Sequence, residues 1–228
     1  MLGLIVLYPF FFILLSRRAW YGGAFVLMKF WARWILLGGL IGVNIERRIA
    51  KNEIPTPCVF VSNHVSYLDI VMAYVVIPTY FVFTGKQELD KAPLFRIFFR
   101  DMNILVDRKS TTGSYRSYVR SSEEVDKGHS IFIFAEATIN SFGKIMPFKN
   151  GAFKLAIDKQ IPIVPITYLN SWKILQNGGF LKSTGKPGIS CAIMHEPVST
   201  KGMTDADLLS LRNTVHDIIK KSLDENEG

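Results

Sequence analysis

The stretch that decides the fold is Cys-Val-Phe-Val-Ser-Asn-His-Val-Ser-Tyr-Leu-Asp, residues 58–69. Its first five residues are small or apolar without alternation, which predicts a strand covered on both faces. The histidine, His64, follows directly, where the strand gives way to a helical pattern. In open α/β sheets, sites form at the carboxyl ends of strands. The stretch therefore predicts a buried strand with a polar site at its end.

Two side chains in this stretch suit acid–base chemistry. With His64 in the loop and Asp69 in the first helical turn, the chain can fold back so that the carboxylate meets the imidazole. The carboxylate then fixes the tautomer, and the other ring nitrogen can take a proton from a hydroxyl. A second interpretation stays open, because Ser66 and Asp69 have capping-box spacing and Asp69 could simply cap the helix.

The rest of the chain alternates short apolar runs with helical patterns. The runs predict strands at 58–62, 80–83, 104–106, 130–134, 163–168 and 189–194. Helical patterns lie near 66–77, 91–101, 112–127 and 150–159, and from 204 onward. This alternation predicts an α/β fold, with a mainly parallel or mixed sheet flanked by helices. The two prolines and several polar residues at 46–57 indicate a connector ahead of it.

The first 45 residues differ from the remainder. An apolar run at 2–15 would form a helix about 21 Å long, shorter than the roughly 30 Å hydrocarbon core of a bilayer. A second run at 21–43 is longer but contains Lys29 and Arg33, which share one helix face. Placing each at mid-membrane would cost about 2.5–3.5 kcal/mol, so we expect that face at the water boundary.

We therefore predict two parts: a membrane-associated helical hairpin at 1–45, dipping into one leaflet, and an α/β domain at 46–228. A pair of full membrane spans and a hairpin buried in the core are the alternatives. Positive charge follows the first apolar run instead of preceding it, so we expect the segment to be retained and not cleaved as a signal peptide.

Composition narrows the class of partner. The net charge of +8 among 228 residues favours an anionic surface, and the apolar N-terminus favours membrane lipids over nucleic acid. Two distant cysteines, in runs that resemble strands, indicate a reduced compartment and small buried side chains. The four histidines show no metal-binding spacing. We predict no metal and no nucleic-acid partner.

Five blocks of sequence resemble, in order, the motifs of the glycerolipid acyltransferases, the lysophosphatidic acid acyltransferase family. The first is Asn-His-x-x-x-x-Asp at 63–69 and the second Met-Asn-Ile-Leu-Val-Asp-Arg at 102–108. The third is Phe-Ala-Glu-Ala-Thr-Ile-Asn-Ser at 134–141. Pro-Phe-Lys-Asn-Gly-Ala-Phe-Lys-Leu-Ala at 147–156 and Ile-Pro-Ile-Val-Pro-Ile at 161–166 follow.

The resemblance implies an O-acyltransferase that moves a fatty acyl chain from acyl-CoA or acyl carrier protein to a hydroxyl of a lysolipid similar to 1-acylglycerol-3-phosphate. It implies His64 and Asp69 as the catalytic pair and no tightly held cofactor. It also implies a membrane location, which we expect to be the cytoplasmic face of a bacterial inner membrane. The oligomeric state stays open. The substrate-binding residues that it implies are Asn63, Lys86, Arg108, Glu136, Ala137 and Thr138.

Two of these assignments have structural alternatives. Lys86 could be a solvated surface lysine. Arg108, whose guanidinium suits a phosphate or carboxylate, could instead form a structural ion pair.

The third block departs from the family pattern at Ala135, Ala137 and Ile139, where the family usually has proline, glycine and arginine. Isoleucine cannot donate a hydrogen bond, and losing one charge-assisted contact weakens phosphate binding by about 1.5–3 kcal/mol. Either other cations such as Lys86 and Lys144 compensate, or the acceptor has a less charged head, such as a lyso-ornithine or lyso-glycine lipid or another lysophospholipid. A non-enzymatic lipid-binding or scaffold protein on the same fold is the remaining alternative.

Overall fold

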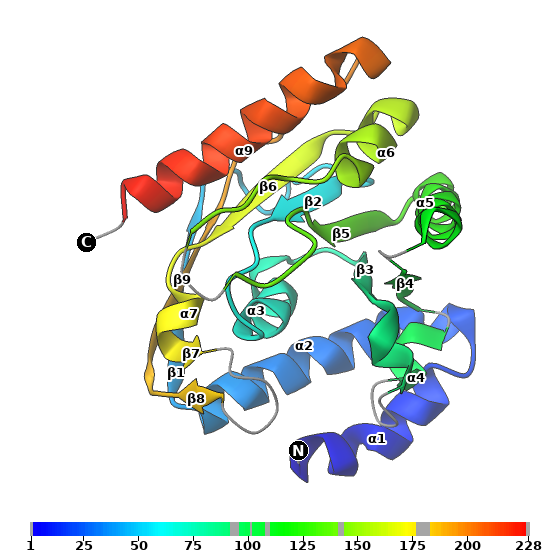
Figure 1. Ribbon diagram of the computed structural model, residues 1–228. Coiled ribbons are helices and arrows are strands. Elements are labelled where there is room, and N and C mark those ends of the chain that lie inside the picture. Colours follow the sequence, from blue (N-terminus) through cyan, green and yellow to red (C-terminus); the bar gives the residue numbers. More distant parts are fainter. Residues whose placement is uncertain are drawn as a thin grey trace.

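The computed structural model describes residues 2–91, 96–100, 102–107, 110–140, 144–176 and 183–226. Within them a seven-stranded sheet runs in the order β1-β9-β6-β2-β5-β3-β4 (Figure 1). Its strands are β1 (Ile41–Arg47), β2 (Val59–Ser62), β3 (Phe81–Lys86), β4 (Ile104–Val106), β5 (Ser130–Phe134), β6 (Ile163–Tyr168) and β9 (Gly188–Met194). Only the β6–β9 pairing in this sheet is antiparallel. A small hairpin, β7 (Leu175–Gln176) and β8 (Thr184–Gly185), stands apart from it.

Helices cover both faces of the sheet (Figure 1). On one side lie α5 (Thr111–Asp126), α6 (Gly151–Lys159) and α9 (Leu208–Asp224), the last preceded by the short helix η3 (Asp205–Asp207). On the other lie α1 (Leu2–Leu14), η1 (Arg18–Trp20), α2 (Tyr21–Gly38) and α3 (Leu68–Val76). The short helices η2 (Gln87–Lys91), α4 (Arg96–Arg100) and α7 (Ser171–Ile174) lie toward the two ends of the sheet.

The central strands are apolar on both sides because each side meets a different helical layer. In β2, Phe60 joins the cluster beneath α2 and α3, whereas Val59 and Val61 join the cluster beneath α6 and α9. Full burial of each such side chain contributes roughly 1.5–3 kcal/mol to the stability of the folded state. This confirms the predicted α/β fold with a mostly parallel sheet, and it explains the uninterrupted apolar runs in the sequence.

The connector expected at 46–57 begins later than predicted. The chain leaves α2 at Gly38 and forms the edge strand β1, which pairs in parallel with β9. Its side chains alternate between half-buried and exposed, as expected of a strand with one covered face. The predicted boundary between residues 45 and 46 therefore falls inside β1. The apolar residues of β1 follow those of α2 almost directly. The sequence pattern therefore does not reveal where the helical spacing ends and the strand alternation begins.

The N-terminal hairpin is packed onto the sheet domain along one side only. Leu4 and Phe11 of α1, and Phe25 and Met28 of α2, are buried in the cluster that contains α3. The opposite side exposes large apolar residues, among them Ile5, Val6, Phe10, Phe12, Ile13, Val26, Phe30, Trp34 and Leu37. In the described part of the chain, no helix has both the length and the apolar character needed to cross a bilayer.

Lys29 does not lie at a water boundary with Arg33, as the sequence had indicated. Its ammonium group donates to the carbonyl oxygens of Ile77 (3.1 Å) and Pro78 (3.0 Å), just after α3 ends. Arg47 adds a bond to the carbonyl of Val76 at 3.2 Å. Carbonyls at a helix C-terminus lack intrahelical partners, so two cations from the N-terminal segment satisfy the end of α3. Arg33 is exposed.

Candidate active site

The strand β2 delivers the predicted pair to the carboxyl edge of the sheet. All four residues of β2 are buried between β5 and β6, and the chain then turns through residues 63–67 into α3. His64 follows the strand immediately and is 7% exposed. Asp69 lies in the first turn of α3 and has no exposure. The short loop therefore brings the two side chains to the same place.

The imidazole and the carboxylate are in hydrogen-bonding contact. Nδ1 of His64 lies 3.1 Å from Oδ2 of Asp69. An ionised carboxylate only accepts hydrogen bonds, so Nδ1 carries the proton and Nε2 keeps its lone pair. Nε2 makes no hydrogen bond to any described residue. This is the arrangement in which a histidine can remove a proton from a hydroxyl.

Asp69 also caps the loop that carries His64. Its Oδ2 accepts hydrogen bonds from the backbone amides of Val65 (2.7 Å) and Ser66 (2.8 Å). The carboxylate thus bonds to the loop ahead of the helix as well as to the imidazole, whereas the N-cap residue of α3, Tyr67, makes no side-chain capping bond. The two amide bonds hold the carboxylate in place, and the same oxygen meets the imidazole.

An aromatic ring fixes the plane of the imidazole. The ring of Phe134, at the end of β5, stacks on His64 with a centroid distance of 3.7 Å and an interplanar angle of 6°. Phe134 is itself held edge-on by Phe132 and Phe83. The hydrogen bond to Asp69 and this stack together restrict ring rotation, so Nε2 has one direction in which to point.

The loop after β5 holds the backbone of His64 from both sides. Oε1 of Glu136 accepts from the amide of His64 at 2.8 Å, and Oε2 accepts from the amide of Met146 at 3.0 Å. The amide of Asn140 donates to the carbonyl of His64 at 2.9 Å. Burial raises the pKa of Glu136 to about 7, against the effect of the two amides. Both oxygens of Glu136 are thus committed to main chain, and this predicted substrate-binding residue positions the loop.

Asn63 is committed in the same way. Its carboxamide donates to the carbonyl of Tyr168 at 2.9 Å and accepts from the amide of the same residue at 2.8 Å. It is fully buried and links the end of β2 to the end of β6. The structure therefore gives the side chain of Asn63 a role in joining strand ends.

The other predicted binding residues differ in how they are placed. Lys86 is exposed at the end of β3, and Thr138 is half-buried in the loop after β5. Ala137 has a left-handed backbone with φ of 61°, which glycine adopts without strain. Arg108 lies outside the described residues.

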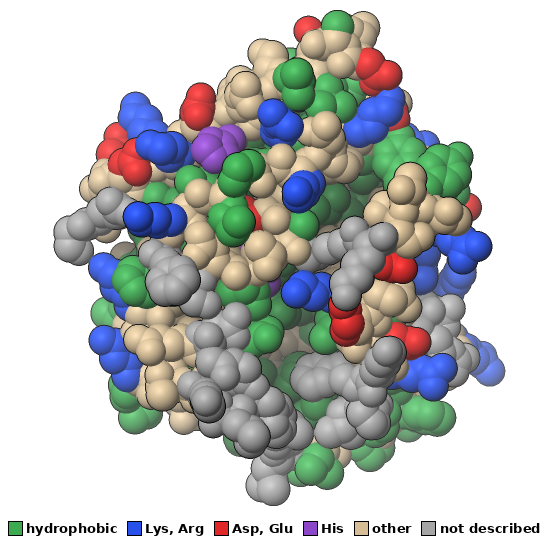
Figure 2. Space-filling view, viewed as in Figure 1, with side chains coloured by type: hydrophobic (Ala, Val, Ile, Leu, Met, Phe, Trp, Pro, Cys, Tyr) green, Lys and Arg blue, Asp and Glu red, His purple; other side chains and the backbone are tan. Residues whose placement is uncertain are grey.

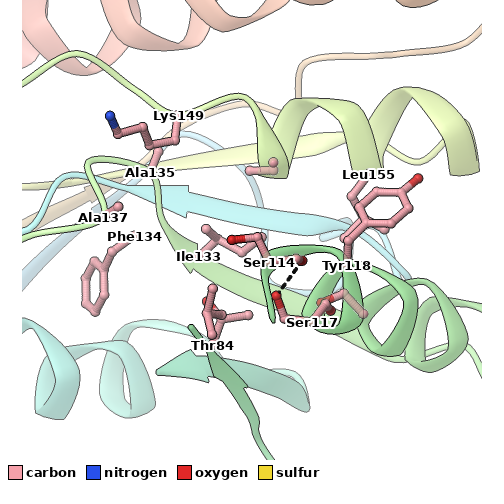
Figure 3. A pocket seen from close by; sticks show the side chains of 14 residues that line it. Thr84, Ser114, Ser117, Tyr118, Ile133, Phe134, Ala135, Ala137, Lys149 and Leu155 are labelled. Carbon is pink, nitrogen blue, oxygen red and sulfur yellow. Dashed lines mark hydrogen bonds between the residues drawn. The ribbon is translucent and has the colours of Figure 1, made fainter. Parts of the chain in front are cut away.

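A cavity of about 420 Å³ adjoins the site on the α5 and α6 side of the sheet (Figure 3). Phe134, Ala135 and Ala137 line its end at the carboxyl end of β5, where the ring of Phe134 belongs to the opposite face of the sheet. Figure 3 shows the polar side chains Thr84, Ser114, Ser117 and Tyr118 together on the other side of the space, with Lys149 above Ala135. We call it the hydroxyl cavity. Figure 2, in the view of Figure 1, shows a surface hollowed near its middle, with apolar side chains in the hollow and Lys and Arg side chains around it.

No group of three or more His, Cys, Asp and Glu side chains in the described ranges is arranged to hold a metal ion.

Sequence reasoning missed Phe134, Tyr168 and Asn140 as parts of the site. Phe134 opens the third sequence block, but a phenylalanine at a strand end indicates core packing and not a stack on a histidine. Tyr168 acts through its backbone, which no side-chain pattern reveals.

Comparison with known proteins agrees with this architecture. A 1-acyl-sn-glycerol-3-phosphate acyltransferase from Haemophilus influenzae is 28% identical over 198 residues, 85% of this chain and 80% of that protein. The human 1-acyl-sn-glycerol-3-phosphate acyltransferase beta is 33% identical over 162 residues, which cover 70% of this chain but only 57% of the human protein. The crystal structure of the 1-acyl-sn-glycerophosphate acyltransferase PlsC from Thermotoga maritima shares the fold with a TM-score of 0.80 at 21% identity, covering 100% of this chain and 94% of that one.

The sequence model of the Acyltransferase family matches residues 44–169, from β1 to the end of β6. That region contains His64, Asp69 and the loop that holds them, and it is more than half of the 228 residues. On this evidence the chain belongs to the acyltransferase family.

Proposed function

We propose that this protein is an O-acyltransferase that moves a fatty acyl chain from a thioester, acyl-CoA or acyl carrier protein, to a hydroxyl of a lysolipid. The observation that carries the proposal is the contact between His64 and Asp69 at 3.1 Å, with Phe134 stacked on the imidazole and Nε2 directed away from the carboxylate. Family membership and the names of the relatives support the same reaction.

In the proposed reaction, Nε2 of His64 accepts the proton of the acceptor hydroxyl as its oxygen attacks the thioester carbonyl. Asp69 stabilises the imidazolium that results. The tetrahedral intermediate collapses with loss of the C–S bond, and the imidazolium returns its proton to the thiolate. We propose direct transfer, because no Ser or Cys of the chain lies in a Gly-x-Ser-x-Gly nucleophile frame. Burial raises the pKa of the Cys58 thiol to about 12, which makes it a poor nucleophile.

The acceptor is proposed as a lysolipid similar to 1-acylglycerol-3-phosphate, the substrate that the names of the relatives give. Lys86 and Lys144, both exposed, and Lys149, which lines the hydroxyl cavity, are the described cations that could meet a phosphate. Ile139, in place of the arginine usual at this position, favours a second candidate: a lyso-aminolipid or another lysophospholipid with a less charged head.

We further propose that the protein works at a membrane surface, at the cytoplasmic face, with residues 1–45 as the attached part. The apolar side of α1 and α2 that faces away from the sheet supports this, with Val26 66% and Leu37 70% exposed. Contiguous exposed apolar surface of this kind is typical of contact with lipid.

The test is acyl transfer by His64→Ala and Asp69→Asn proteins in mixed micelles, with labelled acyl-CoA and acyl carrier protein offered to a panel of lysolipids. General-base catalysis is worth about 10²–10⁴-fold, so both variants should lose at least that range of kcat. His216→Ala, on α9 and far along the chain, is the matched control. A His64→Ala protein with near wild-type turnover would refute the assignment. Lipid binding by a wild-type protein that transfers nothing would favour the scaffold alternative.

A further inference from the structure

A second cavity, of about 780 Å³, lies beyond the edge strand β4, between α5 and the short helices η2 and α4. Three arginines line it: Arg96 of α4, and Arg116 and Arg120 of α5. Two carboxylates, Asp90 and Asp107, line it as well, so the described side chains of its lining carry a net positive charge. We call it the arginine cavity. Figure 2 shows Lys and Arg side chains, with acidic ones among them, on the side where α4 and α5 lie.

The placement of the arginines suits a ligand with more than one phosphate. Arg116 and Arg120 are four residues apart on α5 and therefore share a helix face. Arg96 pairs with Asp90 at 3.3 Å, and both side chains are largely exposed, at 69% and 43%. An exposed ion pair of this kind adds little to stability, so Arg96 can leave Asp90 and bind a phosphate instead. Guanidinium groups bind phosphate in a bidentate manner.

The arginine cavity adjoins the hydroxyl cavity. Ser117 lines both, and β4 contributes Leu105 to the arginine cavity and Val106 to the hydroxyl cavity. The hydroxyl cavity reaches the carboxyl end of β5 at Ala135 and Ala137, in the loop that also holds the backbone of His64. The two cavities therefore form one path, from the arginines along the start of α5 to the end of the sheet beside that loop.

The lining of this path suits an arm that contains amides. The hydroxyl of Ser117 donates to the carbonyl of Ser114, that of Ser121 to the carbonyl of Ser117, and that of Thr84 to the carbonyl of Phe132. Each hydroxyl has used its hydrogen and retains lone pairs, so it can accept a hydrogen bond from an amide N–H. Ile133, Ala152 and Leu155 supply apolar contacts between these acceptors.

We propose that the two cavities together form the acyl-donor site. The arginine cavity binds the phosphates of the nucleotide part of acyl-CoA, and the hydroxyl cavity receives its pantetheine arm and leads the thioester to His64. The inference rests on the proposed function, because it assigns the donor of that reaction. A concave site with three guanidinium groups favours a phosphorylated small molecule over the broad acidic face of a carrier protein, which would require an exposed basic surface.

The experiment compares two donors that share the arm and differ in the nucleotide: palmitoyl-CoA and palmitoyl-pantetheine. The variant is Arg116→Ala/Arg120→Ala. Its matched control is Lys186→Ala/Lys201→Ala, which removes two exposed charges far from both cavities. Melting curves establish that both variants are folded.

The double arginine variant should raise KM for palmitoyl-CoA by about 10–100-fold, since charge-assisted contacts to phosphate are lost. Its kcat, its KM for the lysolipid and its kinetics with palmitoyl-pantetheine should stay at wild-type values. Arg116→Lys/Arg120→Lys should recover part of the affinity. An equal change for both donors, or no change for palmitoyl-CoA, would overturn the proposal. Palmitoyl-acyl carrier protein is offered as a third donor. If the double arginine variant loses activity with that donor alone, the proposal is overturned in favour of a protein-docking surface.

Binding of adenosine 3′,5′-bisphosphate, measured by calorimetry on the full chain, separates this inference from the proposed function. The wild type should bind it, and the double arginine variant should bind at least tenfold more weakly. That result would stand even if the wild type acylated no lysolipid in the panel, in which case the proposed function alone would fail. Equal binding by the wild type and the double arginine variant would reject the arginine cavity as the phosphate site.

Discussion

At the scale of single residues, the backbone of the loop after β5 explains one departure from the family pattern. Ala137 adopts φ of 61°, a conformation that disfavours residues with a Cβ. The amide of Ala135 donates to the carbonyl of Ser62 at 3.2 Å, a bond that proline could not make. The alanine at 135 thus gains a bond to β2, whereas the alanine at 137 carries strain.

Ala137→Gly should therefore stabilise the protein. Removing the left-handed strain gains about 1–2 kcal/mol, and the greater freedom of glycine in the unfolded chain offsets about 0.4–1 kcal/mol of it. Urea denaturation should show a higher midpoint with an unchanged slope. Ala135→Gly, in an adjacent part of the loop, is the control and should not stabilise.

Glu136 gives a prediction for pH. Its pKa rises from an ordinary 4.5 to about 7 on folding, chiefly because of burial. Between these values the folded protein binds more protons than the unfolded chain, so the contribution of Glu136 to stability is complete below about pH 4.5 and is lost as pH rises to about 7. The difference in unfolding free energy between wild type and Glu136→Gln should fall over that window.

Glu136→Gln should also lower kcat, because one of the two amides, of His64 or of Met146, loses its acceptor. An unsatisfied buried amide costs about 1–3 kcal/mol. Urea titrations from pH 4 to 8 measure the first effect and acyl transfer measures the second. A free-energy difference that stays constant with pH would show that Glu136 does not titrate in this window.

At the scale of elements, α3 is held at both ends by residues from elsewhere. Asp69, in its first turn, accepts from the amides of Val65 and Ser66 in the preceding loop, and Lys29 and Arg47 bind the carbonyls at its other end. Burial and the neighbouring cations lower the pKa of Lys29. The charged ammonium group is therefore less favourable here than in water. The helix that carries Asp69 is therefore anchored by side chains of α2 and β1.

Lys29→Met keeps the apolar stem and removes both bonds to the end of α3. We expect a loss of about 1–3 kcal/mol in unfolding free energy. Arg33→Met, one turn further along α2 and exposed, should change stability by no more than about 0.5 kcal/mol. Thermal and urea unfolding compare the two. Equal effects would mean that the carbonyl bonds of Lys29 contribute nothing.

At the scale of the whole molecule, α2 has two functions on opposite sides. Phe25 is 4% exposed and contacts the rings of Tyr74, Tyr80 and Phe81, whereas Phe30 is 48% exposed. One side closes the core of the α/β domain, and the other is left apolar and uncovered by any described residue. The hairpin is therefore part of the fold as well as the proposed membrane contact.

Substitutions on the two sides should separate these roles. Phe30→Ser/Leu37→Ser should leave the melting temperature unchanged and weaken binding to vesicles of anionic phospholipid by at least about tenfold. Phe25→Ala should instead cost about 3–5 kcal/mol of stability, because it opens a cavity in the core. Vesicle sedimentation and thermal unfolding give the two readouts. Unchanged sedimentation of the first variant would rule out this side of α2 as the lipid contact.

The sequence by itself determined the alternating fold and the pairing of His64 with Asp69. Both depend on local patterns: apolar runs of strand length, and two side chains on one short loop. It also indicated an apolar N-terminal hairpin. It misassigned the start of the connector, because the apolar residues of β1 continue those of α2 and only pairing with β9 distinguishes a strand there.

Tertiary structure alone decided what surrounds the pair. Glu136 reaches His64 across 72 positions of sequence, and Asn63 reaches Tyr168 across 105. These contacts give Glu136 and Asn63, both predicted to bind substrate, a structural role in holding the loop and joining the strand ends. A hydrogen bond between distant segments depends on the register and order of the strands, which the packing of both helical layers sets. No pattern within either segment specifies it.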